Sequence, residues 1–516
     1  MNGKLIGTPV LAIAAVAAFA APRAAHAASC ESLAKLALPD TTITLAEAVA
    51  AGGLKLPVPA GPGGIGGAGG NPYAALPAFC RIAGTIKPTP DSDIRFEVWM
   101  PATSWNGKFV GVGNGVWAGS ISYFEMVQPL MRGYATAATD DGHQGSPLDA
   151  TFAVGHPEKL VDFGHRAPHE MTVKAKAAIE AFYEKKPQRS LFVSCSTGGR
   201  QGLMEAYRYP DDYDGISSMA PANPMVPLMV SSLWTGYVAL KDDASHLPPP
   251  KLMLIKQAAV KACDAKDGVT DGVIRDPRAC SFDPSVLACK GADAPDCLTT
   301  AQVAAVRAIY AGPRNPRSNA QIYPGFEFGS EAMFPLQTGG PEPFPVATSF
   351  FRGLVIGDPK WDFRSFDYDK DVQTATSKFS SILDVPPTGL GPFFSKGKKL
   401  LLSHGWADGL IPARSTVNFH AALTKAIGAQ QTAAGVRLFM VPGMGHCAGG
   451  DGPSSIDTIG TIDEWVGSGQ APARILASNP PGAPARTRPL CPEPEVAKYS
   501  GSGSTDDAKS FSCGKP

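Results

Sequence analysis

The stretch that most constrains the fold is a short apolar run that passes at once into a helix-forming segment. Residues 190–194 read SLFVS, which is typical of a buried strand, and the run from Gly199 onward favours a helix. Between them residues 194–199 read SCSTGG, which leaves room only for a tight turn. Strands that lead directly into helices build sheets covered by helices on their faces. The sequence therefore predicts an α/β fold.

The same alternation recurs along much of the chain. An amphipathic helix is predicted over 168–183. Residues 28–84 look irregular, and the alternation is lost again between residues 222 and 390, where prolines and aromatics are frequent. We expect a core from residues 28–221 and 391–516, with residues 222–390 inserted as a lid domain. The other predicted strands cover residues 94–100, 108–112, 133–138, 399–403 and 436–441.

The N-terminus reads as a secretory signal peptide. Lys4 precedes an apolar stretch over residues 6–21, and Ala25-His26-Ala27 is a small-x-small cleavage site. Cleavage after Ala27 predicts a secreted or periplasmic protein. In such an oxidising compartment the even count of 10 cysteines favours disulfides.

The charge balance excludes one class of partner. Lys+Arg and Asp+Glu are both 46, so no global basic field exists to hold nucleic acid. After the signal segment no run is long and apolar enough for a membrane helix, so we expect no membrane association after cleavage.

The turn at residues 194–199 is also a candidate catalytic site. Serine hydrolases of the α/β class place their nucleophile between a strand and a helix, with small residues two positions away on either side. Ser196 has Ser194 before it and Gly198 after it. The N–H of Thr197, at the helix start, is then a candidate oxyanion donor. A plain Ser/Gly turn is the alternative for so short a motif.

The order of residues along the chain supports the catalytic interpretation. In this fold the acid and then the base follow the serine. Asp408 follows the predicted strand at 399–403, and His446 lies in a glycine-rich loop after the strand at 436–441. We expect Ser196 to attack, His446 to take its proton, and Asp408 to orient the imidazole.

Two cysteines flank these residues. Cys195 precedes Ser196 and Cys447 follows His446, so contact between Ser196 and His446 can bring the two sulfurs within disulfide range. A zinc site made from both cysteines and a histidine is the alternative, although no C-x-x-C spacing supports it.

The remaining site residues have weaker signals. Gly115, in the turn after the strand at 108–112, is the candidate second oxyanion donor. Substrate contacts are expected in the lid, where an aromatic wall and a polar group could come from Trp234, Phe350, Phe351 and Arg352, although aromatics more often fill cores.

At these residues the chain resembles the tannase/feruloyl esterase family of secreted hydrolases. The resemblance covers most of the mature chain and rests on a Cys-Ser, Asp and His-Cys constellation, here Cys195-Ser196, Asp408 and His446-Cys447. It extends to residues 105–122, 163–183 and 195–216; Ser194 departs from the Gly common in the family. The resemblance implies an α/β-hydrolase core, an inserted lid and hydrolysis of aromatic-acid esters.

The resemblance and the sequence proximity of the cysteines together imply five disulfide pairs. Connectivity does not follow from sequence alone, and the first and last pairs rest mainly on the resemblance. The implied pairs are Cys30–Cys80, Cys195–Cys447, Cys263–Cys280, Cys289–Cys297 and Cys491–Cys513.

An acidic loop in the lid is a candidate Ca²⁺ site. Three aspartates fall within the eight residues 264–271, which include one glycine and are followed by another, with Lys266 as the single cation among them. Ca²⁺ prefers six to eight oxygen ligands, and the resemblance favours such a site, whereas an Asp-Gly surface turn is the alternative. We expect a structural role far from the chemistry. The expected ligands are the side chains of Asp264, Asp267 and Asp271 and the carbonyls of Val269 and Val273.

The sequence thus predicts a secreted serine carboxylic-ester hydrolase, feruloyl esterase-like, that acts on small aromatic esters as a monomer without an organic cofactor. Gallate esters, as for a tannase, and monohydroxyethyl terephthalate are alternative substrates. Two alternatives from other classes are a non-catalytic calcium-dependent binding protein and a carbohydrate-binding protein.

Overall fold

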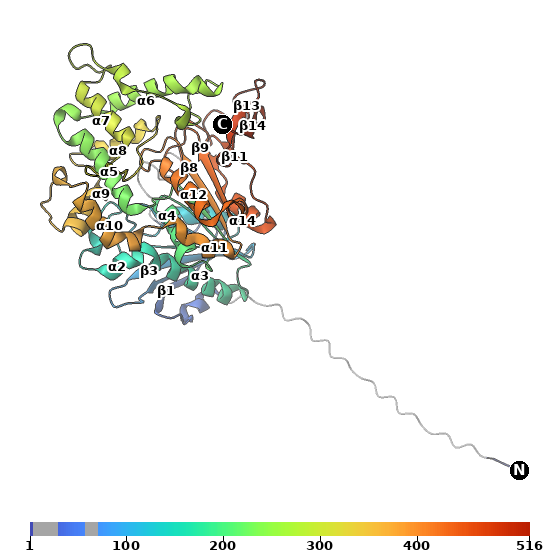
Figure 1. Cartoon of the computed structure of the whole chain (residues 1–516). Coiled ribbons are helices and arrows are strands. Elements are labelled where there is room, and N and C mark those ends of the chain that lie inside the picture. The colour runs from blue at the N-terminus through green and yellow to red at the C-terminus, as the bar shows by residue number, and fades with distance from the viewer. Residues whose placement is uncertain (4–28, 57–70) are drawn as a thin grey trace.

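A mixed sheet forms the centre of the computed structural model, which describes residues 1–3, 29–56 and 71–516 (Figure 1). Within these residues the sheet has nine strands in the order β1-β2-β3-β5-β4-β6-β7-β8-β9. Strands β4 to β9 run parallel, whereas β1, β2 and β3 form an antiparallel edge. The strands are β1 Thr41–Val49, β2 Phe79–Ile86, β3 Ile94–Pro101, β4 Lys108–Gly111, β5 Ala135–Thr139, β6 Arg189–Cys195, β7 Gly215–Met219, β8 Lys399–Gly405 and β9 Val436–Val441.

Helices cover both faces of this sheet. In β8, Leu400 and Leu402 face one core, which α3, α4 and α12 complete, while Leu401 faces a second core with α1 and α14. This period-two alternation follows from the strand geometry, and it buries both faces as parallel sheets require. The helices are α1 Tyr123–Met131, α2 Pro157–Val161, α3 Ala167–Tyr183, α4 Thr197–Arg208, α5 Met225–Leu240, α6 Pro249–Cys263, α7 Thr300–Ala311, α8 Pro335–Thr338, α9 Pro345–Ser349, α10 Lys370–Leu383, α11 Gly391–Ser395, α12 Arg414–Ile427, α13 Ala429–Gly435 and α14 Thr458–Ser468.

The predicted α/β-hydrolase architecture is confirmed, although strand β7 was not predicted and one further segment differs from the expectation. Residues 28–84 are not irregular, because β1 and β2 pair there at the edge of the sheet. Side chains of β1 are mostly half-buried or exposed, so this edge strand lacks a strong apolar pattern. The predicted signal segment lies almost wholly outside the described residues.

Between β7 and β8 the chain leaves the sheet and forms a largely helical insertion, which we call the lid; its boundaries at residues 222 and 390 and its role as a lid stay predictions. Helices α5 to α10 form its body, drawn in green, yellow and light orange in Figure 1. Trp117 connects the sheet domain to the lid. Its ring is buried and lies 5.6 Å from the ring of Phe350, and its indole N–H donates to the Val346 carbonyl at 2.9 Å.

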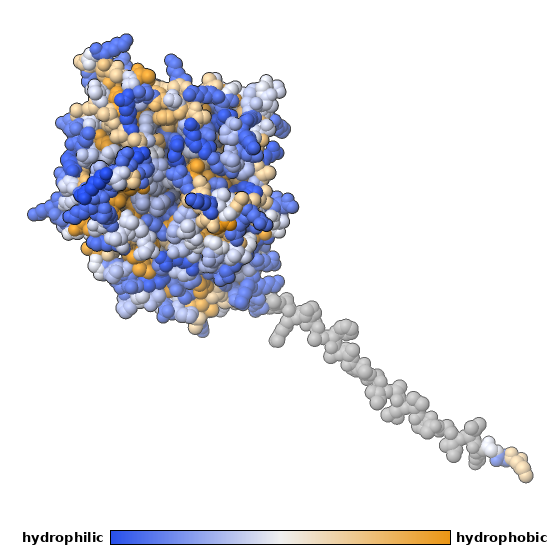
Figure 2. Space-filling model, in the orientation of Figure 1, coloured by the Kyte–Doolittle hydropathy of each residue, from blue (hydrophilic) through white to orange (hydrophobic). Residues whose placement is uncertain are grey.

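The C-terminal segment adds two small antiparallel sheets. Strands β10 Ser455–Ile456, β11 Ile475–Ser478 and β12 Thr487–Leu490 form one, and β13 Val496–Tyr499 pairs with β14 Phe511–Gly514. No helix in the described ranges combines the length and apolarity needed to span a membrane. Figure 2 shows apolar residues in separate patches among hydrophilic ones on the visible face.

All ten cysteines lie in the described part of the chain and form five disulfides, in the pairing that the resemblance implied. The zinc interpretation of Cys195 and Cys447 is therefore wrong, because their sulfurs bond to each other. Five disulfides are typical of proteins that fold in an oxidising compartment. The Cα–Cα separations run from 4.9 to 6.0 Å.

Candidate active site

The turn between β6 and α4 holds Ser196 in a backbone conformation that a non-glycine residue rarely adopts. Its φ is 62° and its ψ is −124°. The surrounding hydrogen bonds enforce this conformation, because the Ser196 N–H donates to the Met219 carbonyl and its carbonyl accepts from Arg200 and Ala222, all at 3.0 Å. Strain of this kind presents a nucleophile at the end of a strand.

The glycines after Ser196 leave no space for side chains. A Cβ added to Gly199 would lie 2.6 Å from the Met219 carbonyl oxygen, and one added to Gly198 would overlap Ser194 Oγ. The tight approach of the nucleophile helix to the sheet therefore explains the small residues around Ser196.

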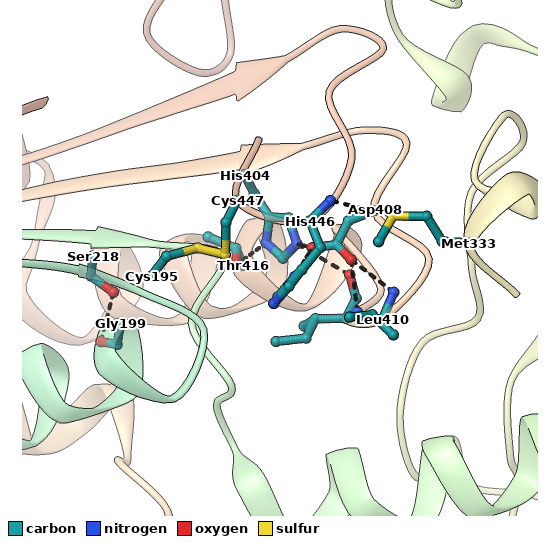
Figure 3. Close-up of a disulfide and its surroundings, with 11 residues drawn as sticks. Cys195, Gly199, Ser218, Met333, His404, Asp408, Leu410, Thr416, His446 and Cys447 are labelled. Atoms are coloured by element: carbon teal, nitrogen blue, oxygen red, sulfur yellow. Dashed lines mark hydrogen bonds and ion pairs between the residues drawn. A yellow bond between two sulfur atoms is a disulfide. The ribbon is translucent and has the colours of Figure 1, made fainter. Parts of the chain in front are cut away.

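The predicted acid and base meet at the ends of the next strands. Asp408 follows β8, His446 follows β9, and His446 Nδ1 lies 2.7 Å from Asp408 Oδ2 (Figure 3). The Asp408 side chain is buried, and its Oδ1 accepts hydrogen bonds from the N–H groups of Leu410 and Ile411 at 2.8 and 3.0 Å. With Nδ1–H donating to the carboxylate, His446 Nε2 is left to accept a proton.

The charge of Asp408 is stabilised by its neighbours. Burial alone would raise the pKa of this carboxyl, but the charge of His446 and the hydrogen bonds from His404 and His446 outweigh it and hold the pKa well below its usual range. Asp408 is thus ionised at neutral pH, as a residue that orients and stabilises an imidazolium must be.

His404 is a second histidine on the same carboxylate. Its Nε2 lies 3.1 Å from both Asp408 Oδ2 and the Ile411 carbonyl, and its Nδ1 lies 2.7 Å from Thr416 Oγ1. Both Nε2 partners are acceptors, so Nε2 carries the proton and Nδ1 accepts from the threonine hydroxyl. Its spacing of four residues from Asp408 is the one signal for this contact in the sequence.

A disulfide ties the nucleophile turn to the base loop. Cys195 and Cys447 are 6.0 Å apart at Cα and directly neighbour Ser196 and His446 (Figure 3). In the described residues no hydrogen bond joins Ser196 Oγ to His446. Catalytic hydrogen bonds are often long without substrate and tighten when it binds.

The predicted oxyanion donors lie on two segments, the start of α4 and the loop after β4, which are joined by hydrogen bonds. The Gly198 N–H donates to the Asn114 carbonyl at 2.7 Å, and Thr197 Oγ1 donates to the Val116 carbonyl at 2.8 Å. These bonds hold the loop that carries Gly115 against the start of α4. The use of the Thr197 and Gly115 N–H groups as oxyanion donors stays a prediction.

The residues predicted for substrate contact occupy packing positions. Phe350 and Phe351 are fully buried in the lid core, and the indole N–H of Trp234 donates to the Ala308 carbonyl at 3.0 Å. Arg352 is partly buried and pairs with Glu342 at 2.8 Å. In this conformation Phe350 and Phe351 have no exposed surface that could contact a substrate. Substrate contact by these four residues stays a prediction.

The acidic loop in the lid folds around a small cavity. Asp267, Val269, Asp271 and Val273 all line this cavity of about 20 Å³, which has room for one water or ion. Asp264 lies beside it and accepts from the N–H groups of Asp271 and Gly272.

Two arginines accompany these carboxylates, one just after the loop and one from the C-terminal segment. Arg488 Nη2 lies 2.5 Å from Asp271 Oδ2, and Arg275 Nε lies 3.7 Å from Asp267 Oδ2. The loop also contacts the base loop, because Pro442 lines the cavity and Val273 would lie 2.9 Å from a Cβ on Gly443. The loop is therefore nearer to the chemistry than we expected from the sequence.

Comparisons with known proteins identify the family of this chain. The family model described as "Tannase and feruloyl esterase" matches residues 80–514. An uncharacterized esterase of Xanthomonas campestris is 37% identical, over 94% of this chain and 91% of its own. The mono(2-hydroxyethyl) terephthalate hydrolase of Piscinibacter sakaiensis is 33% identical, over 86% of each chain.

A solved structure shows the same architecture. The crystal structure of feruloyl esterase B from Aspergillus oryzae is similar with a TM-score of 0.86 and 28% identity, covering 94% of this chain and 99% of that one. With its serine between a strand and a helix and its hydrogen-bonded Asp408 and His446, this carboxylic-ester hydrolase belongs to the tannase and feruloyl esterase family.

Proposed function

We propose that Ser196, His446 and Asp408 hydrolyse esters of aromatic, hydroxycinnamic-type acids through an acyl-enzyme. The observation that carries this proposal is the 2.7 Å contact of His446 with Asp408, linked to the Ser196 turn through Cys195–Cys447. The family membership supports ester hydrolysis, and the feruloyl esterases among the relatives support the acyl class.

The reaction proceeds in two steps on these residues. His446 Nε2 takes the Ser196 proton while Oγ bonds to the ester carbonyl carbon, and the oxyanion is stabilised by the Thr197 and Gly115 N–H groups. Collapse breaks the bond to the alcohol oxygen, which leaves with the proton from His446. Water, deprotonated by His446, then attacks the acyl-enzyme and releases the acid and free Ser196.

The acid moiety is tested by comparing methyl ferulate, methyl gallate and mono(2-hydroxyethyl) terephthalate. We expect the highest kcat/KM for methyl ferulate, by at least about 10-fold, the scale on which pocket contacts discriminate. The terephthalate monoester is the second candidate because a hydrolase named for it is 33% identical to this chain. A higher kcat/KM for gallate or terephthalate would contradict the ferulate proposal and leave the serine mechanism intact.

We propose that the chain is exported and loses residues 1–27. Lys4, the apolar stretch and the Ala25-His26-Ala27 site support this, and so do the five disulfides. N-terminal sequencing of the protein from its native host should begin at Ala28.

The donors around the lid cavity fit a bound Ca²⁺. Asp267, Asp271, Val269 and Val273 line one small space together with Arg275 and Arg488, and carboxylate and backbone oxygens are the ligands that Ca²⁺ prefers. Burial raises the pKa of both Asp267 and Asp271, the arginines only partly opposing it, so a further cation would stabilise their charged forms. Asp264, Asp267, Asp271 and the Val269 and Val273 carbonyls would hold the ion, whose role there would be to neutralise and crosslink the loop.

Removing the ion should destabilise the protein. We expect EGTA to lower the Tm by several degrees and Ca²⁺ to restore it, since free ligand at 100 times its Kd stabilises by about 2.7 kcal/mol. Asp267→Ala should abolish the Ca²⁺ response, whereas Asp362→Ala, at a lid aspartate that caps a short helix, should keep it. If EGTA does not change the Tm of the wild type, the arginines alone neutralise the loop and no structural Ca²⁺ is bound there.

A further inference from the structure

One lid segment contacts the loops of both the catalytic acid and the catalytic base. It comprises residues 329–338, with a short helix over Glu331–Met333 followed by α8. The Gln337 side-chain amide donates to the Gly409 carbonyl, next to Asp408, at 2.7 Å. On the other side Met333 Sδ lies 3.4 Å from the backbone nitrogen of His446 (Figure 3).

Glycines in the two catalytic loops allow this close approach. A Cβ on Gly409 would lie 2.6 Å from Met333 Cβ and 2.7 Å from the Ser330 carbonyl oxygen. A Cβ on Gly445 would lie 3.2 Å from Met333 Sδ. The lid segment therefore fills the space that these two glycines leave open.

The lid segment is firmly anchored within the lid. The Glu331 carboxylate is fully buried and accepts from the Gly329 N–H and from the Tyr310 hydroxyl at 2.5 Å. Ser330 Oγ donates to the Glu327 carbonyl, and the Glu327 carboxylate forms a two-point ion pair with Arg414 of α12. Met333 is thus presented to His446 from a segment held in place by buried hydrogen bonds and an ion pair.

We propose that Met333 is a positioning residue that fixes the backbone of the catalytic base, so that the lid takes part in catalysis as well as enclosing the substrate. The proposal rests on the assignment of His446 as the base. The thioether sulfur accepts the His446 N–H, which thereby has a partner inside the protein. Loss of this acceptor would let the loop shift and move Nε2 relative to Ser196, and a displacement of that kind lowers kcat.

Three substitutions distinguish the effect of losing the hydrogen-bond acceptor from the effect of losing side-chain volume. Met333→Leu keeps a comparable apolar volume and removes the acceptor, Met333→Gln supplies an amide oxygen at similar reach, and Met333→Ala removes both. We expect kcat to fall about 5-fold in the Leu variant, as for one neutral hydrogen bond, and about 10-fold or more in the Ala variant. The Gln variant should stay within about 2-fold of wild type, with KM within about 2-fold in all three, because only the reacting geometry changes.

The controls keep this test decisive if a variant folds poorly. Met253 lies exposed on α6, so Met253→Leu and Met253→Gln should leave kcat unchanged. The Tm of each variant identifies losses that come from unfolding. Equal kcat in the Leu, Gln and wild-type proteins would overturn the role of the sulfur. Losses of kcat that parallel losses of Tm, and that the Gln variant does not restore, would overturn it as well. A wild type without esterase activity would instead overturn the assignment of the base, and the positioning role with it.

Discussion

Ser196→Ala should lower kcat/KM on methyl ferulate by four orders of magnitude or more. Removing the nucleophile of a serine hydrolase eliminates the acyl-enzyme route and leaves only the contributions of binding and the oxyanion donors, which costs about 10⁶ in a well-studied case. The strained turn at Ser196 is stabilised by backbone hydrogen bonds, which alanine can also form. The fold should therefore survive, and the Tm should stay close to that of the wild type.

The neighbouring serine provides the matched control for this measurement. Ser194 lies two residues away, near the end of β6, and is buried, so Ser194→Ala probes the local packing without touching the proposed nucleophile. We expect it to keep kcat/KM within about 10-fold of wild type, since its effect is limited to packing. If wild type and Ser196→Ala have the same negligible turnover, the chain is a binding protein, either the calcium-dependent or the carbohydrate-binding alternative.

The fold and the meeting of Asp408 with His446 were predictable because their signals are local. A buried strand that meets SCSTGG, and two further strand ends that carry Asp408 and His446, each fit within about a dozen neighbouring residues. Chain order then links the three, because parallel strands bring their carboxyl ends to one edge of the sheet.

Contacts between segments that are distant in the chain gave no comparable pattern in the sequence. Arg488 pairs with Asp271 across 217 residues, and Met333 contacts His446 across 113, so neither pair has a periodicity that sequence reasoning can detect. The half-exposed strand β1 and the serine-containing strand β7 were missed for a different reason. Their burial depends on sheet neighbours, and their own side chains give only a weak apolar signal.

The disulfide beside the catalytic residues should affect catalysis, whereas the C-terminal one should affect stability alone. Replacing Cys195 and Cys447 together by alanine removes a disulfide that closes a loop of 252 residues. The chain-entropy relation predicts that this loss lowers the free energy of unfolding by about 5 kcal/mol. We further expect kcat to fall about 100-fold, because the link holds the His446 loop to the Ser196 turn and small misplacements of reacting groups have effects of that size.

The pair Cys491–Cys513 is the control, since it closes a loop of 22 residues near the C-terminus and has no contact with the acid–base pair. Its double alanine variant should lose about 3 kcal/mol of unfolding free energy and keep kcat within about 2-fold. Measuring kcat well below the Tm of each variant separates the two effects. If the Cys195–Cys447 variant keeps the wild-type kcat while its Tm falls, the disulfide only stabilises the fold, and the backbone hydrogen bonds at Ser196 and the Met333 sulfur contact suffice to align the nucleophile with its base.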